Sequence, residues 1–316
     1  MEELILPRAI ERSERILVAG AGGGFDVFAG VPVYERLRRL GKRVWLANLS
    51  FTNLANTDAT HLGDALWAVD ATSRTSDVYF PERALARFLE SRGDASTIYA
   101  FEKTGVAPLR DAYASILSTH AIDAIVLVDG GTDILLRGDE CELGTPAEDA
   151  TSLAAVSALS DLVATKVVMC VGFGIDAYHG VCHSHWLENV AALTREGAFL
   201  GAIALRREMQ EVQLYLDAVE AGDIATPSRP SIVNGSIASA IDGRFGNHHR
   251  SKRTKSSTLF INPLMTLLWA FDLDAVARRN LYLRELMATE SVWDVQVLIE
   301  AFHSQVAKRP RVAFPH

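Results

Sequence analysis

The sequence predicts an α/β fold, with a Rossmann-like, mostly parallel sheet, helices on both of its faces, and a helical C-terminal part. Three observations support this prediction. Short apolar runs that read as buried strands alternate with helical stretches. Such continuous apolar runs are typical of parallel strands covered on both faces. A glycine-rich turn links the first strand to a helix, and Gly/Asp turns follow two later strands.

The first part of the chain contains a βαβ unit. Residues 1–14 read as a charged lead-in helix or arm. A strand, a glycine turn, a helix and a second strand follow within residues 15–49, the pattern of a right-handed crossover. Residues 50–77 are polar, rich in Asn, Thr and Asp, and lack a clear period, so we interpret them as an excursion above the sheet.

The individual elements predicted for residues 15–128 are strand 15–19, helix 27–40 and strand 43–49, then helix 81–93, strand 97–101, helix 109–120 and strand 124–128.

The alternation continues beyond residue 128. We expect helix 146–164, strand 166–171, helix 184–195, strand 199–205 and helix 208–220. After prolines near 227–230 the sequence predicts mostly helix, at 263–280 and 290–306. We therefore divide the chain into a Rossmann-like α/β core, residues 1–225, and a mostly helical part, residues 226–316, packed on the core in one globular unit.

Composition limits the class of protein. The 316 residues are 49% apolar and 22% charged, and the net charge of −8 lacks the basic excess usual for nucleic-acid binders. Three cysteines cannot form a disulfide framework, which indicates a reducing compartment. The start of the chain is acidic, unlike a signal peptide, and no apolar run approaches the roughly 20 residues of a membrane span. We expect a cytoplasmic protein without nucleic-acid or membrane partners; a homo-oligomer is left open.

Three of the strongest strands end in a turn that combines glycine with aspartate. In a parallel sheet these ends share one edge, where α/β proteins bind ligands. Glycine and aspartate are also the commonest turn residues, so a single turn of this kind has a structural explanation. Three in succession favour a site. The carboxylates could hold a divalent cation, orient sugar hydroxyls or act as acid and base. The candidates are the carboxylates Asp26, Asp133 and Asp176, and the substrate-binding residues Gly130, Gly131 and Thr132.

The first glycine turn does not match a dinucleotide fingerprint. Its third glycine would fall at Phe25, and the next strand ends near Asn48 rather than an acid. The sequence also lacks a P-loop motif. The amides of Gly22, Gly23 and Gly24 are candidates for binding a phosphate or carboxylate at the start of a helix. The alternative is close packing of helix on strand, with Asp26 as a cap.

Residues 176–185 are dense in potential ligands and proton carriers. We expect His179 or His183 to act as acid or base, or to bind substrate. A metal ion held by Asp176, His179 and His183 is an alternative, although the spacing fits no standard structural zinc pattern. Histidines that merely lead into a helix are a third interpretation. The sequence identifies no cofactor with certainty, and a divalent metal ion is the cofactor that we leave open.

A basic loop at 244–255 is the main departure from the acidic composition. It contains five Lys or Arg residues and two histidines. One interpretation is a mobile lid that clamps an anionic substrate through Arg244 and Arg250. The other is a solvated surface loop.

Three short motifs together resemble a known family. They are the turn from Gly22 to Asp26 after the first strand, the turn from Asp129 to Asp133, and the ending Phe314-Pro315. The resemblance is to the prokaryotic family catalogued as domain of unknown function 1152, over most of the chain. It implies an α/β fold and supplies no reaction.

From the residues alone we expect an enzyme that acts on a small polar substrate, phosphorylated or nucleoside-like, by hydrolysis or group transfer. No nicotinamide or flavin signature supports a redox reaction. The alternative is a non-catalytic regulatory protein that binds a metabolite or nucleotide on the same scaffold.

Overall fold

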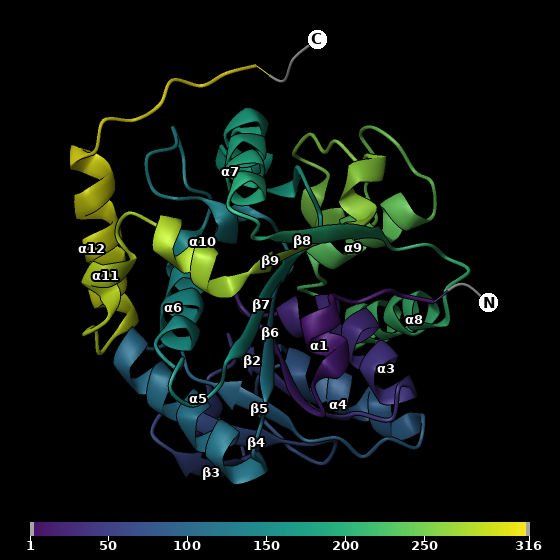
Figure 1. Ribbon diagram of the computed structural model, residues 1–316. Coiled ribbons are helices and arrows are strands. Elements are labelled where there is room, and N and C mark those ends of the chain that lie inside the picture. Colours follow the sequence, from purple (N-terminus) through teal and green to yellow (C-terminus); the bar gives the residue numbers. More distant parts are fainter. Residues whose placement is uncertain (1–2, 314–316) are drawn as a thin grey trace.

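A nine-stranded sheet forms the centre of the computed structural model, which describes residues 3–313 (Figure 1). Its strand order is β3-β4-β5-β2-β1-β6-β7-β9-β8. Five central strands are parallel to one another. They are β5 (Ile98–Phe101), β2 (Arg43–Leu49), β1 (Arg15–Gly20), β6 (Ala124–Asp129) and β7 (Thr165–Cys170).

The order of the parallel strands reverses at β1. The chain moves from β1 to β2 and β5 on one side, and then returns to place β6 and β7 on the other side. Gly20, the last residue of β1, pairs with Asn48 of β2 and with Val128 of β6. The chain after β1 leads toward β2, whereas the chain after the adjacent strand β6 leads toward β7 on the other side. A crevice can therefore open between the two loops.

Helices cover both faces of the sheet, as the sequence predicts (Figure 1). Each face has its own apolar core, one centred on Phe28 and Tyr215 and the other on Tyr113 and Trp186. The first face carries α1 (Arg8–Arg12), α2 (Asp26–Ala29), α3 (Val31–Arg39), α4 (Pro81–Ser91), α8 (Gln210–Ala225) and α9 (Ile232–Ile241). The second carries α5 (Val106–His120), α6 (Pro146–Ser157), α7 (His183–Arg195), α10 (Leu273–Arg279), α11 (Leu283–Leu286) and α12 (Val292–Gln305).

The polar segment at 50–77 is not wholly irregular. It contains the antiparallel strands β3 (Thr60–Gly63) and β4 (Leu66–Val69), which extend the sheet beyond β5. β3 is exposed along its length, so no alternation of buried and exposed positions predicts it. β4 is held by burial of Trp67 and Val69 against Phe80.

The predicted helix at 263–280 is wrong in its first half. Residues Leu267–Asp272 form strand β9, which lies antiparallel between β7 and the edge strand β8 (Phe199–Ala204). The run contains Trp269 and Phe271, which favour a strand when packed on a sheet. Asp272 ends the strand and its Oδ1 accepts the Ala275 amide at 2.8 Å, which caps α10. The C-terminal part therefore adds a strand to the sheet as well as helices.

No helix within residues 3–313 combines the length and the apolar character required to cross a bilayer. Phe314 and Pro315, which contribute to the family resemblance, lie outside the described residues.

The insertion of β9 leads to a prediction about stability. Phe271 is fully buried and contacts the core of the second face. We expect Phe271→Ala to lower the free energy of unfolding by about 3–5 kcal/mol, the usual loss for a buried Phe truncated to Ala. Phe245→Ala, at a side chain that is 69% exposed, is the matched control and should change it by less than about 0.5 kcal/mol. Urea denaturation measures both, and equal losses would contradict the placement of β9 in the core.

Candidate functional site

The first glycine turn wraps around its own carboxylate. The Gly22 amide donates to Asp26 Oδ2 at 2.6 Å, and the Gly24 amide donates to the Leu49 carbonyl at 3.0 Å. Gly23 and Gly24 have φ angles of +90° and +63°, which side chains with a Cβ rarely adopt. Amide hydrogens that the sequence suggested for an external anion are thus used within the protein.

Asn48, at the end of β2, holds this turn from behind. Its Nδ2 donates to the Gly24 carbonyl at 2.8 Å and to Glu82 Oε1 at 2.7 Å, while its Oδ1 accepts the Val27 amide at 3.2 Å. Burial raises the pKa of Glu82 to about 7. Sequence reasoning noticed Asn48 only as the absence of a ribose-binding acid. The structure shows that Asn48 fixes the start of α2 and hence the position of Asp26.

The two later Gly/Asp turns are joined by hydrogen bonds. Thr132 donates to Asp176 Oδ2 through its amide at 2.8 Å and its hydroxyl at 3.1 Å. Asp133, at the start of the short helix Asp133–Leu135, accepts the Thr145 amide at 2.7 Å. Asp176 therefore ties the loop after β7 to the loop after β6, and Asp133 ties the latter to the start of α6.

Three carboxylates converge where these loops meet. Oxygen atoms of Asp26, Asp129 and Asp149 lie within 4.8 Å of one another. Asp149, in the first turn of α6, is 4% exposed, and its Oδ1 has no hydrogen-bond partner among the described residues. The sequence prediction missed Asp129 and Asp149 as site residues. An acid in the first turn of a helix is ordinary, so Asp149 gave no separate signal.

The glycines around the cluster are explained by close approach of carboxylates to the backbone. A Cβ at Gly22 would lie 2.8 Å from Asp26 Oδ2 and 2.9 Å from Asp149 Oδ1. A Cβ at Gly130 would lie 2.8 Å from Asp26 Oδ1. Any larger residue at these positions would displace the carboxylates. Gly22 and Gly130 therefore leave space for the carboxylates. The sequence had indicated only that glycine and aspartate occur in the same turns.

Burial raises the pKa of all of these acids, and like charge adds to the shift for all of them except Asp133. Burial raises the pKa of Asp26 to about 7, and it raises the pKa of Asp133 as well. For Asp129, Asp149 and Asp176, burial is again the largest cause, neighbouring carboxylates add to it, and each pKa lies well above its usual range. Near neutral pH such a cluster is stabilised either by protons or by a bound cation.

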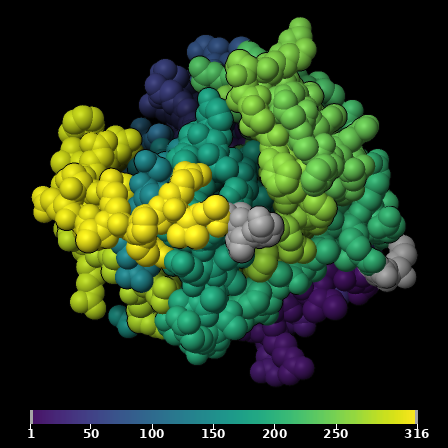
Figure 2. Space-filling model, turned by 90° about the horizontal axis from the view of Figure 1, so that it is seen from above, coloured from purple at the N-terminus to yellow at the C-terminus, as the bar shows by residue number. Residues whose placement is uncertain are grey.

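A cavity of about 510 Å³ adjoins the cluster. Asp26 and Asp176 form part of its wall, whereas Asp129 and Asp149 lie behind it, so the cluster is reached from the cavity through Asp26. The other polar or aromatic lining includes Tyr79, His179, Arg229 and Arg253. The segments that line the cavity include those after β1, β2 and β7, the start of α9 and part of the basic loop after it, at the end of the molecule that Figure 2 views.

Some predicted residues do not reach this cavity. His183 lines a separate cavity of about 280 Å³ with Phe173 and Pro263. Arg244 is exposed and is absent from the lining, and Arg250 pairs with Asp223 at 3.4 Å. Within the basic loop it is Arg253 that lines the cavity, where its Nη1 donates to the Pro230 carbonyl at 2.7 Å.

Fold and site together define an α/β protein with a glycine-braced carboxylate cluster at the carboxyl edge of a parallel sheet core. The chain belongs to the family described as protein of unknown function, DUF1152, whose model matches residues 17–303. No curated protein and no solved structure matches the chain significantly.

The raised pKa values predict a pH dependence of stability. A carboxyl whose pKa is higher in the folded than in the unfolded protein contributes to stability at low pH. That contribution is lost as the pH rises from the unfolded pKa of 3.8 to the folded pKa, which is about 7 for Asp26. The Asp149→Asn variant lacks one such titrating group. We therefore expect this variant, in chelator, to gain stability relative to the natural protein by at least about 1 kcal/mol between roughly pH 5 and pH 8.

The control for this comparison is Asp161→Asn, at an exposed position, whose stability should follow that of the natural protein at both pH values. Chemical denaturation at the two pH values measures the difference. A constant difference between Asp149→Asn and the natural protein across this range would show that Asp149 is not perturbed.

Proposed function

We propose that the protein is an enzyme that acts on a small anionic substrate, phosphorylated or nucleoside-like, by cation-assisted hydrolysis or group transfer. The observation that carries the proposal is the convergence of Asp26, Asp129 and Asp149 within 4.8 Å, with Asp26 on the wall of an open cavity. A buried carboxylate oxygen without a partner is costly unless something charged occupies the space beside it.

The cation we propose is Mg²⁺ or Mn²⁺, because carboxylate oxygens are the ligands that these hard ions prefer. Asp149 Oδ1, with no partner among residues 3–313, is the first ligand to consider. Asp26 and Asp129 would complete the protein ligands, and water or substrate oxygens would fill the remaining positions. A divalent charge would also lower the raised pKa values, so that the acids ionise together.

The substrate class follows from the rest of the lining. Arg229 and Arg253 supply positive charge for a phosphate or carboxylate. Phe51 and Tyr79 supply aromatic surface on which a base or sugar can pack, and the Arg229 guanidinium lies 5.8 Å from the centre of the Tyr79 ring. We assign anion binding to these arginines rather than to the glycine amides.

The strand order supports the location. In Rossmann-like and other doubly wound sheets, ligands bind outside the carboxyl ends of the strands where the strand order reverses. Here the reversal occurs at β1, beside β6. Asp129 is the last residue of β6, and Asp26 begins α2, which follows β1. We propose that the parallel core is used in the Rossmann-like manner, with the substrate in this crevice.

For a phosphate monoester the proposed reaction is simple to balance. An oxygen of water, or of an acceptor hydroxyl, forms a bond to phosphorus while the ester P–O bond breaks. A cation held by Asp26, Asp129 and Asp149 would stabilise the charge on the phosphoryl oxygens. His179 lies on the cavity wall, and we propose that it carries the proton from the nucleophile to the leaving alcohol.

The first test is cation dependence of turnover. We expect phosphate release from at least one member of a panel of nucleoside monophosphates and sugar phosphates, in Mg²⁺ or Mn²⁺ and not in chelator. Asp129→Asn should lower kcat/KM by at least about 100-fold, because it removes a proposed ligand. Asp161→Asn is the matched exposed control. Calorimetry should show Mn²⁺ binding to the natural protein and much weaker binding to Asp129→Asn.

Mn²⁺ and nucleotide binding without turnover of any panel member would instead favour the non-catalytic regulatory protein. Absence of Mn²⁺ binding would contradict the carboxylate site itself.

The second test distinguishes the arginines of the basic loop. Arg253→Gln should weaken binding of inorganic phosphate to the Mn²⁺-loaded protein by about tenfold, the loss of one charge-assisted hydrogen bond. Arg244→Gln, in the same loop but outside the cavity, should leave the Kd unchanged. Calorimetric titration with phosphate measures both. An effect of Arg244→Gln equal to that of Arg253→Gln would favour a lid that closes with the whole loop.

A further inference from the structure

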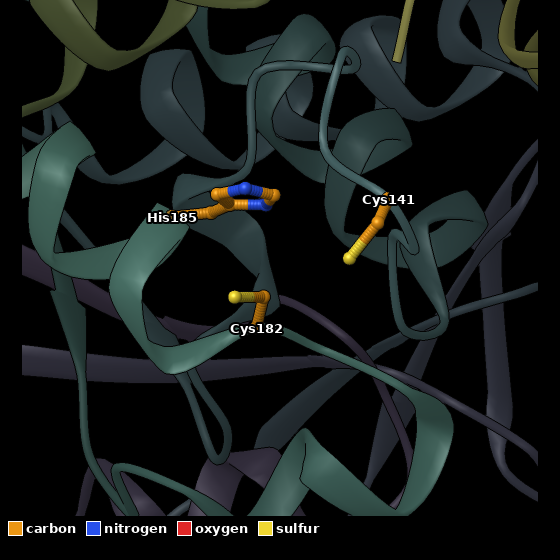
Figure 3. Close-up of side chains that lie close together, drawn as sticks. All are labelled: Cys141, Cys182 and His185. Atoms are coloured by element: carbon orange, nitrogen blue, oxygen red, sulfur yellow. The ribbon is translucent and has the colours of Figure 1, made fainter. Parts of the chain in front are cut away.

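A second group of potential metal ligands lies apart from the carboxylates. The sulfur atoms of Cys141 and Cys182 and a ring nitrogen of His185 lie within 4.8 Å of one another. Figure 3 shows the three side chains around a common space. Cys182 and His185 are buried, and Cys141 is partly exposed.

Local structure explains why these side chains meet. Cys182 is the N-cap residue of α7 and His185 lies in its first turn, so a spacing of three residues puts both on one side of the helix start. Cys141 comes from the loop before α6. Its neighbour Glu140 is fully buried and accepts Asn189 Nδ2 of α7 at 2.8 Å, which holds this loop against the helix.

The hydrogen bonds of His185 determine which nitrogen is available. Nε2 lies 2.9 Å from the carbonyl oxygen of Pro310, which can only accept, so Nε2 carries the proton. Nδ1 is then unprotonated, with its lone pair directed outward from the ring. Nδ1 is buried and has no hydrogen-bond partner in the described part of the chain. A histidine whose other nitrogen donates to a backbone carbonyl is the usual arrangement of a metal ligand.

We propose that Cys141, Cys182 and His185 form a binding site for Zn²⁺ or a similar borderline-soft divalent cation. The ligands would be the two sulfur atoms and His185 Nδ1, with water in the fourth tetrahedral position. In such a site two sulfurs lie about 3.8 Å apart, so a closure of about 1 Å suffices. Cys141 is in a loop and can supply this movement.

The site would secure the end of the chain. Residues 307–313 cross the start of α7, as Figures 1 and 2 show for the segment beyond α12. Arg309 pairs with Glu140 at 2.8 Å. In the metal-free structure Cys182 Sγ also donates to the Val312 carbonyl at 3.3 Å, a hydrogen bond that is lost when the thiol gives up its proton to bind the cation. A cation on His185 would polarise the ring and strengthen its bond to Pro310. The loop before α6, the start of α7 and the terminal segment would then be joined at one point.

The two metal sites differ in chemistry, which makes them separable. The carboxylate cluster offers only oxygen and suits Mg²⁺ or Mn²⁺, whereas sulfur and imidazole favour Zn²⁺ and Co²⁺. Co²⁺ is the probe we choose, because thiolate ligands give it an intense charge-transfer absorption in the near ultraviolet and carboxylates do not. The result is independent of the proposed enzymatic activity.

The experiment titrates Co²⁺ into the reduced, chelator-treated full-length protein. We expect a charge-transfer band that saturates at one equivalent and that Zn²⁺ abolishes. Cys141→Ser, at a partly exposed position where folding is least affected, should remove most of the band. His185→Gln should weaken Co²⁺ binding by at least about tenfold. Cys170→Ala, which alters a cysteine outside the cluster, should retain the band at full intensity.

Two results would overturn the proposal. One is Co²⁺ binding without a charge-transfer band in the natural protein. The other is an unchanged band in Cys141→Ser that is folded by circular dichroism. In the first case, a Cys141–Cys182 disulfide in protein purified without reductant would identify the two cysteines as a redox pair rather than metal ligands.

Discussion

The need to keep several carboxylates buried side by side is the constraint that shapes this protein. Asp26, Asp129 and Asp149 cannot approach one another unless the backbone between them is stripped of side chains. Glycine at positions 22 and 130 meets that need, because even one methyl group there would contact a carboxylate oxygen. Asp133 and Asp176 are each restrained by a backbone amide and a threonine hydroxyl, which bond to one carboxylate oxygen. Gly22 and Gly130 are thus explained by the acids, whereas Gly23 and Gly24 are explained by their positive φ angles.

The sheet makes this arrangement possible. β1, β6 and β7 run parallel, so their carboxyl ends lie at the same edge of the sheet. The three loops that follow these strands therefore meet without any long excursion. The reversal of strand order at β1 separates the loops enough to leave a cavity beside them. Asn48 and Glu82 then fix the first loop from the opposite side of β1. Fold and site are therefore linked through a small number of buried polar contacts.

The sequence predicted much of the fold, since buried strands and capped helices leave local patterns. It also predicted that Asp26, Asp133 and Asp176 share an edge, which follows from strand polarity alone. It did not predict Asp149, whose place in the cluster depends on how α6 packs. β9 was missed because an apolar run beside helix signals is ambiguous until the neighbouring strands are known. Arg253 could not be distinguished from Arg244 and Arg250, because composition identifies a basic loop without indicating which side chain faces the cavity.

A purely structural account of the acid cluster is difficult to sustain. Hydrogen bonds explain one oxygen each of Asp26, Asp133 and Asp176, which brace loops. They do not explain Asp149, whose Oδ1 has no partner among the described residues and whose pKa burial and the neighbouring acids raise. An asparagine or an apolar residue would fill the same space with less penalty. Burial of this group is relieved by a proton or by a cation, and a cation would turn the same oxygen into a ligand. Asp26, the member of the cluster that reaches the cavity, shares its wall with arginines and aromatic rings, an environment that would suit the anionic substrate we propose.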